Sequence, residues 1–217
     1  MANENWQPSW KDLRDDKIKP DFKPKTVLHE SLLWEQGYIC CYCGRRICRA
    51  SSHIEHLKPR TTFPELSLCY LNLLASCPGY LEEEDSKSLT ESQCPQEHCG
   101  HKKGSWYEPQ LMVSPLEIDC EEYFRYTAFG EILPTNAPER ELAAQETIER
   151  LGLNHVSLER ARRQAVEATL LIMDGLDAED LQRLVESYEQ PNEEGKYVRF
   201  CEVVLYFLKS AVANSQS

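Results

Sequence analysis

The chain has 217 residues, a hydrophobic fraction of 41% and a formal net charge of -12 at pH 7. This length allows one domain, or a small core domain with an appendage, and the apolar content is enough to bury a core. No segment approaches the roughly 20 apolar residues that span a bilayer, and residues 1–10 lack the apolar stretch of a signal peptide, so we expect a cytoplasmic protein that is not associated with a membrane.

The negative charge is unevenly distributed. Residues 1–110 hold 14 Lys and Arg against 16 Asp and Glu, whereas residues 111–217 hold 10 against 20. Contacts to phosphate need Lys and Arg, so this balance argues against a chain that binds nucleic acid strongly by itself. The acidic surplus of the second half could instead face a basic partner.

The N-terminal third predicts an arm, a helix and a short hairpin. Residues 1–25 carry Trp6 and Trp10 without a sustained period, which is typical of an extended arm. Thr26 can cap a helix that runs to about residue 36, where Gly37 ends it. A hairpin around residues 43–44 should follow, with its second strand ending near His56.

The middle of the chain predicts a loop, an insertion and another helix. Residues 57–75 contain two prolines and should form a loop that crosses the site. The acidic run 82–85 marks an exposed insertion between Cys77 and Cys94. A helix that bears His101 should start near Gln96 and continue towards Tyr107.

The last third predicts a β-hairpin followed by helices. Residues 121–133 should form a β-hairpin that turns near Gly130. Helices are expected near 138–151, 157–175, 177–190 and 196–213. The prediction is therefore an α+β protein with an N-terminal arm (1–25), a core (26–135) and a helical C-terminal region (136–217).

Ten cysteines are many for an intracellular protein of this size unless several of them bind metal. Cys40 and Cys43 are spaced as Cys-x-x-Cys with Gly44 behind them, as in a zinc knuckle. Cys77 and Cys99 are the predicted second pair of a structural Zn²⁺ site.

Other assignments of these cysteines stay open. Cys94 and His98 are substitutes for the second pair of ligands. Cys69 and Cys77 could also be buried apolar thiols. A redox role for the Cys-x-x-Cys pair would need a surrounding βαβ pattern, which the sequence lacks.

The order of these motifs resembles the HNH endonucleases, and more closely the PtuB-type nuclease subunits of Septu and retron-associated anti-phage systems. The likeness covers roughly residues 27 to 135 and is carried by five pieces: Tyr38 to Gly44, Ile54-Glu55-His56, Asn72-Leu73, Cys99 to Gly104, and Val113 to Leu116 followed by Asp119-Cys120-Glu121. It implies a zinc-stabilised ββα-metal core. It also implies a nucleic acid substrate, a PtuA-like ABC-type ATPase partner and, in a retron, a reverse transcriptase with its nucleic acid.

The resemblance assigns the chemistry to four side chains. His56 is the candidate general base, and Asn72 orients it or fixes the loop. Glu55 and His101 would hold a catalytic Mg²⁺ or Mn²⁺. The chain departs from the commonest family pattern in having Glu55 where Asp is usual and in the spacing Cys99-x-His101.

Neighbouring basic residues complete the predicted site. Lys102 and Lys103 would contact phosphate oxygens of the substrate. His53 is the nearest competitor for the role of base, but a strand position beside the site is the preferred interpretation. His29 and His155 fall in helical contexts, where a satisfied surface or core role is expected.

Two function classes follow. The first is a metal-dependent HNH endonuclease in anti-phage defence, and the second is an inactive zinc-binding adaptor of an ATPase complex. The joint presence of Glu55, His56, Asn72, His101 and Lys102 favours the enzyme, because an adaptor needs only the cysteines. The sequence does not choose between DNA and RNA as the substrate.

Overall fold

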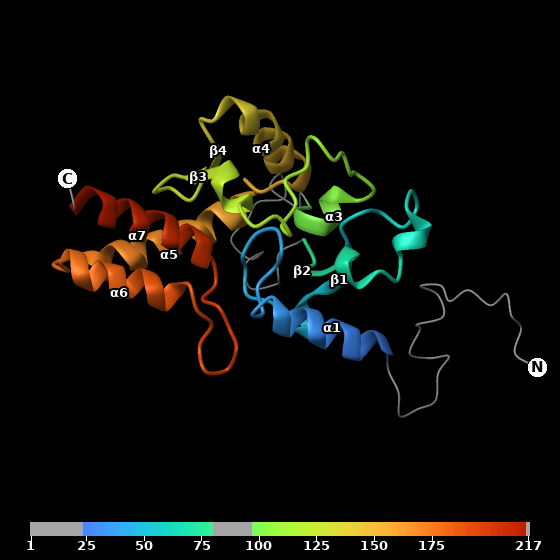
Figure 1. The fold of residues 1–217 in the computed structure, drawn as a ribbon, viewed down its shortest axis with the longest axis horizontal. Coiled ribbons are helices and arrows are strands. Elements are labelled where there is room, and N and C mark those ends of the chain that lie inside the picture. Colours follow the sequence, from blue (N-terminus) through green and yellow to red (C-terminus); the bar gives the residue numbers. More distant parts are fainter. Residues whose placement is uncertain (1–23, 80–96, 216–217) are drawn as a thin grey trace, which may run out of the picture.

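The computed structural model describes residues 24–79 and 97–215, and it confirms a mixed α+β protein that is mostly helical with two small β-hairpins (Figure 1). Most of the predicted arm, the acidic insertion, Cys94 and the predicted helix start at Gln96 lie outside these residues. Within the described ranges, no helix is both long and apolar enough to cross a membrane.

The first helix, α1, spans Pro24–Glu35 and begins two residues before the predicted cap. Proline suits the first turn of a helix because its missing N–H would have no partner there. The helix buries His29, Leu32 and Leu33. It ends where Gly37 adopts a φ of 56° and the Tyr38 N–H donates to the carbonyl of Leu33 over 2.8 Å.

A short turn follows and takes the place of the predicted hairpin. Its two sides form a single isolated β-bridge, between Ile39 and Arg46, and no regular strands. Within it, the Gly44 N–H donates to the Cys40 carbonyl over 3.0 Å, and Gly44 has a φ of 67°. The chain thus reverses direction tightly around residues 40–44, and this turn is called the knuckle below.

The first regular hairpin pairs β1 (His53–His56) with β2 (Leu73–Ser76) in antiparallel register, so that His56 faces Leu73 and His53 faces Ser76. The prediction of a loop over residues 57–75 was wrong at its end, because residues 73–75 belong to β2. All four residues of β2 are buried, so its sequence has no polar alternation that would mark a strand.

Helix α3 spans Cys99–Lys103 and is much shorter than the predicted helix that reaches Tyr107. Gly104 ends it with a φ of 54°. The helix lies against the β1–β2 hairpin, since the Gly100 N–H donates to the Ser76 hydroxyl over 3.4 Å and the Lys103 ammonium donates to the His56 carbonyl over 3.0 Å.

The second hairpin pairs β3 (Phe124–Tyr126) with β4 (Ile132–Pro134) and turns at Gly130, as predicted. Gly130 has a φ of 86°, and a Cβ there would lie 2.0 Å from the Glu159 carbonyl oxygen. Glycine is therefore required both for the turn and for the close approach of the helix that carries Glu159.

Four helices complete the chain: α4 (Pro138–Leu151), α5 (Val156–Met173), α6 (Ala178–Tyr188) and α7 (Cys201–Ser215). Short 3₁₀ turns lie at Arg49–Ser51, Pro64–Leu66, Tyr70–Asn72 and Cys120–Tyr123. The last helix begins five residues later than predicted. The segment before it is bonded to the turn at residues 40–44, because the Phe200 N–H donates to the Gly44 carbonyl over 2.8 Å.

The main core joins the two halves of the chain. Leu32 and Leu33 of α1 pack in one cluster with Leu151, Leu153 and Leu158 of the helical region. The same cluster holds the four cysteines Cys40, Cys43, Cys77 and Cys99. The sulfurs therefore lie where α1, the β1–β2 hairpin and the C-terminal helices meet.

Candidate functional site

Four cysteines from three separate parts of the chain converge in the core. The Sγ atoms of Cys40, Cys43, Cys77 and Cys99 all lie within 4.8 Å of one another. Their exposed fractions are 1%, 4%, 0% and 0%. Among the described residues, this is the group of three or more His, Cys, Asp or Glu side chains that could hold a metal ion.

Backbone geometry aims the sulfurs at a common point. The knuckle turn at Gly44 places Cys40 and Cys43 on one side, and the Cys77 N–H donates to the Cys40 Sγ over 3.3 Å. Cys99 enters from the start of α3 with a φ of 55°, which is unusual for a residue with a side chain. Such strain persists where the surroundings fix it, often at a ligand site.

The protonation of the cluster also favours a cation. Burial is the largest cause that raises the pKa of the Cys99 thiol well above its ordinary value. Burial also acts to raise the pKa of Cys40, but hydrogen bonds from Cys41, Cys43 and Cys77 outweigh it and lower this pKa well below the ordinary value. Four buried sulfurs can thus carry little negative charge by themselves, whereas a divalent cation would stabilise several thiolates. The donor set and its burial fit a structural zinc.

His98 lies beside the cluster. Its Nδ1 atom is 3.1 Å from the Cys99 Sγ and 3.8 Å from the Cys77 Sγ, and the side chain is fully buried. Burial lowers the pKa of His98 to about 4, so the ring is neutral at pH 7. The structure thus keeps this substitute ligand close to the sulfurs without making it one of the four.

His56 closes strand β1 and is held by the loop that follows. Its Nε2 lies 3.0 Å from the Ser67 carbonyl oxygen, and only 8% of the residue is exposed. A carbonyl can only accept, so this contact places the ring proton on Nε2 and makes Nδ1 the basic nitrogen of the neutral ring. Burial is the largest cause that lowers the pKa of His56.

Asn72 fixes the same loop through three hydrogen bonds. Its Oδ1 accepts from the Lys58 N–H over 2.8 Å, and its Nδ2 donates to the carbonyls of Lys58 and Leu66 over 3.0 and 3.2 Å. Asn72 thereby ties together the two ends of the segment that carries Ser67. Its contacts are those of a residue that positions the loop beside His56.

Glu55 lies in a buried ion pair. Its Oε1 is 2.9 Å from the Lys103 ammonium, and its Oε2 is 3.4 Å from the His53 Nε2. The Tyr42 hydroxyl donates to Oε1 over 3.3 Å. Since alternate residues of a strand share a face, His53 and Glu55 lie on one side of β1, the side that meets α3.

His101 lies on the exposed side of α3 and is not in a metal-binding group with Glu55 in the described residues. Its Nδ1 contacts the Pro78 carbonyl, and its ring lies against that of His53 with centroids 4.9 Å apart. Gly100 permits this arrangement, because a Cβ there would be 2.7 Å from the Glu55 Oε2. The predicted residues Glu55 and His101 are therefore neighbours through His53.

The two lysines differ from each other in environment. Lys102 is exposed and its side chain passes close to Gly152 at the end of α4. Lys103 is 3% exposed and pairs with Glu55, which does not fit the predicted phosphate contact. The sequence Lys-Lys alone does not tell which side of a five-residue helix faces the core, and in the structure Lys103 is the one that faces inward.

Three groups that contact the candidate site residues were not predicted from the sequence. The Ser67 carbonyl is a backbone group and leaves no sequence signal. Tyr42 could have been suspected from its place between Cys41 and Cys43, which fixes it beside the hairpin. The counter-ion role of Lys103 could be inferred only from a three-dimensional placement of α3.

The comparison with known proteins finds a distant relative. No known family profile matches the chain. A protein of Vibrio cholerae serotype O1 biovar El Tor, named "Retron Vc95 putative HNH endonuclease", is 29% identical over 154 residues, which are 69% of this chain and 68% of that protein. The chain is thus a distant homologue of a retron-associated protein that carries an HNH endonuclease name.

Proposed function

We propose that this chain is a zinc-stabilised HNH endonuclease that hydrolyses phosphodiester bonds of nucleic acid with the help of a divalent cation. The observation that carries the proposal is His56, held at the end of β1 by the Ser67 carbonyl in a loop that Asn72 fixes. The arrangement of hairpin β1–β2 and helix α3 supports a ββα-metal core, and the name of the Vibrio cholerae relative supports the activity.

His56 is the proposed general base. Its lowered pKa keeps the imidazole neutral at pH 7, and the tautomer set by Ser67 leaves Nδ1 as the atom that accepts a proton from water. Asn72 acts as a positioning residue, because it holds the loop that orients the imidazole.

Glu55 and His101 are the proposed ligands of the catalytic Mg²⁺ or Mn²⁺, with His53 as the competitor of His101. The cation, when bound, would neutralise charge on the scissile phosphate. The Glu55 carboxylate would then contact two positive groups, the cation and the Lys103 ammonium. Lys102, which is exposed at the same helix, remains the proposed phosphate contact.

Cys40, Cys43, Cys77 and Cys99 are the proposed ligands of the structural Zn²⁺. This site is closed, since all four donors are buried protein sulfurs. The zinc would hold the knuckle, the end of β2 and the start of α3 in place, and so position the strand that carries His56.

The direct test is a cleavage assay with plasmid DNA, linear DNA and tRNA, with Mg²⁺ or Mn²⁺ and with a chelator. We expect cleavage by the wild-type chain, alone or with its ATPase partner, and a loss of roughly 10²- to 10⁴-fold with His56→Ala. Zinc content and circular dichroism should be unchanged in this variant. Near wild-type cleavage by His56→Ala, together with inactivity of His53→Ala, would assign the base to His53.

One observation favours the alternative of an inactive zinc-binding adaptor. Glu55 is already neutralised by the buried Lys103, and its carboxylate does not converge with His101 in a metal-binding group of the described residues. An adaptor would bind zinc and its partner but would leave every nucleic acid of the assay intact with either cation.

We further propose that the acidic second half docks on a PtuA-like ABC-type ATPase in anti-phage defence, with a reverse transcriptase and its nucleic acid in a retron setting. Ten surplus negative charges on residues 111–217 support a basic partner surface. Removal of residues 138–217 would also remove core residues such as Leu151, so charge reversal is the better test.

Reversal of acids on α6 to lysine, at the exposed Glu179 and Glu186 and the half-buried Asp180, should weaken co-purification of the ATPase. The matched control reverses Glu30, Glu65 and Glu108, which are exposed in the first half of the chain. Equal loss of the partner in both variants, or no loss in either, would place the docking surface elsewhere.

A further inference from the structure

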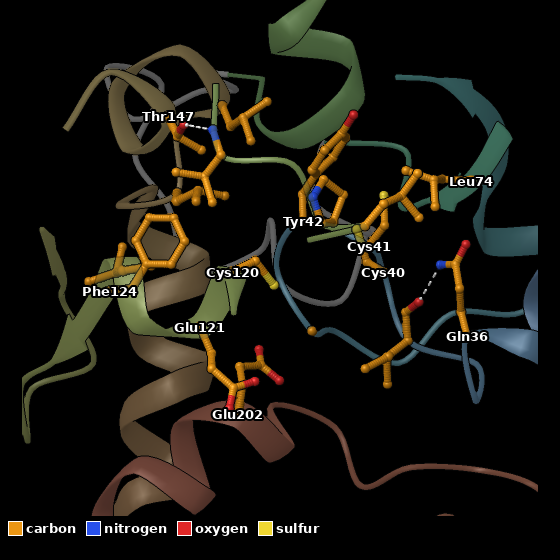
Figure 2. A pocket seen from close by; sticks show the side chains of 18 of the residues that line it. Gln36, Cys40, Cys41, Tyr42, Leu74, Cys120, Glu121, Phe124, Thr147 and Glu202 are labelled. Carbon is orange, nitrogen blue, oxygen red and sulfur yellow. Dashed lines mark hydrogen bonds between the residues drawn. The ribbon is translucent and has the colours of Figure 1, made fainter. Parts of the chain in front are cut away.

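A cavity of about 320 Å³ lies between the knuckle, the segment 113–126, helix α4 and the start of α7 (Figure 2). Its walls are mostly apolar and include Ile39, Leu74, Val113, Phe124, Ile132 and Leu151. None of His56, Glu55 and His101 lines it. The cavity therefore lies beside the proposed nuclease site, next to the proposed zinc ligand Cys40 and to Tyr42, and its volume is in the range of small-molecule pockets.

Two carboxylates, those of Glu121 and Glu202, are the acidic groups of this lining, and Figure 2 shows both at the same part of the cavity. Glu121 is exposed and Glu202 is half-buried. Glu202 lies against the knuckle, since a Cβ on Gly44 would be 1.9 Å from its Oε1. Its Oε2 accepts from the Cys201 thiol over 3.6 Å. Within the described residues, neither carboxylate lies within 4.0 Å of a Lys, Arg or His nitrogen.

Two other polar side chains of the lining, Gln36 and Thr147, are already engaged. Gln36 donates to the carbonyls of Ile39 and Ala75 and accepts from the Ala75 N–H. Thr147 accepts from the Val113 N–H and donates to the Leu111 carbonyl. The hydrogen-bonding groups that remain in the lining include the Tyr126 hydroxyl and the two carboxylates, which can only accept when ionised.

Placing a carboxylate among mostly apolar walls is costly, and burial is the largest cause that raises the pKa of Glu202. Hydrogen bonds from its own backbone and from the Cys201 thiol, and the charge of Arg162, act in the opposite direction. A bare metal ion is a poor match, because Mg²⁺ and Ca²⁺ need about six oxygen ligands and the remaining walls are apolar. An organic cation matches both features, since its charged end meets the carboxylates while its apolar body fills the chamber.

We propose that this cavity is a binding site for a small organic cation, a primary ammonium on an aromatic or branched aliphatic body, with Glu202 as its principal anionic contact and Glu121 as the second. The proposal does not rest on nuclease activity.

The test is calorimetric titration of the full-length, zinc-loaded protein with 2-phenylethylamine and 3-methylbutylamine, and with 2-phenylethanol as the neutral counterpart. We expect saturable binding of at least one amine, weaker binding of the alcohol, and a roughly ten- to hundredfold loss of amine affinity in Glu202→Gln. Glu141→Gln is the matched control, because it removes the same charge from an exposed position on α4 outside the lining.

A second variant tests the location without touching the carboxylates. Leu116 lines the cavity and is 52% exposed, so Leu116→Trp should fill the space without disturbing the core and should abolish binding. A peptide that presents a lysine beside an apolar residue tests whether the cation comes from a protein, and we expect it to bind more weakly than the free amines.

The proposal is overturned by any of four results: no binding of either amine at millimolar concentration, equal affinity for the alcohol, unchanged affinity in both Glu202→Gln and Leu116→Trp, or tighter binding of the peptide. Each of these results leaves the nuclease proposal intact, because the titration measures no cleavage.

Discussion

Glu55 and Lys103 form a buried pair at the centre of the candidate site. Both side chains have little exposure, 10% for Glu55 and 1% for Lys103, and their charged atoms are 2.9 Å apart. The removal of one member of a buried pair leaves the other charge uncompensated, which typically costs about 3–5 kcal/mol.

We therefore expect Lys103→Met to destabilise the protein by roughly 3 kcal/mol and the double variant Lys103→Met with Glu55→Gln to recover much of this loss. Urea denaturation of the wild type, both single variants and the double variant gives the coupling energy. If the changes in unfolding free energy of the two single variants simply add up in the double variant, the side chains do not interact in solution. That result would contradict the 2.9 Å contact.

At the scale of the element, the loop between β1 and β2 is held by one side chain. Asn72 satisfies one N–H and two carbonyls of this segment. We expect Asn72→Ala to cost about 2–3 kcal/mol and to speed amide hydrogen exchange selectively over residues 57–72, because buried polar groups lose their partners.

Asn154→Ala is the matched control for this effect. Like Asn72, Asn154 holds a backbone segment through its side-chain amide. It accepts from the Ile132 N–H and donates to the Ile132 carbonyl, both over 2.8 Å. Its loss should speed exchange near β4 and leave the loop at wild-type rates. Uniform exchange changes over the whole protein in both variants would contradict a local role for Asn72.

Helix α5 begins at a histidine cap that should respond to pH. The His155 Nδ1 accepts from the Ser157 N–H over 3.3 Å, and burial is the largest cause that lowers the pKa of His155 below its ordinary value of 6.5. A pKa that is lower in the folded state favours the neutral ring. Its contribution to stability is present above pH 6.5 and is lost as the pH falls through the folded value.

We expect His155→Asn, which keeps a capping oxygen but does not titrate, to have a flatter dependence of unfolding free energy between pH 7.5 and pH 5 than the wild type. Parallel denaturation curves at several pH values give this comparison. The other histidines are common to both proteins, so identical pH profiles would contradict the assigned role of His155.

The boundaries of α4 and the Gly130 hairpin were predictable because their signals are local: a proline start with helical periodicity, and a run of aromatic residues before a turn glycine. Strand β2 and the late start of α7 were not, because burial on both faces of β2 and the hydrogen bond from Phe200 to Gly44 are tertiary effects. For the site, the spacing of the motifs identified the four cysteines that converge in the structure. The motif His-Lys-Lys, in contrast, could not show that Lys103 faces inward.

At the scale of the whole molecule, the sulfur cluster joins segments that are distant in sequence. Cys40 and Cys99 lie in one core with Leu33 of α1 and Leu158 of α5. Binding of zinc to a buried thiolate site can supply about 10 kcal/mol or more of folding free energy. We therefore expect Cys43→Ser and Cys77→Ser to lower solubility and the melting temperature of the entire chain, including its C-terminal helices.

Elemental analysis of the purified protein tests this central claim most directly. We predict one zinc per chain in the wild type and in Cys69→Ser, a half-buried cysteine outside the cluster, and loss of zinc in Cys43→Ser and Cys77→Ser. A wild-type protein that unfolds cooperatively but contains no stoichiometric zinc would contradict the account, as would retention of zinc by both cluster variants.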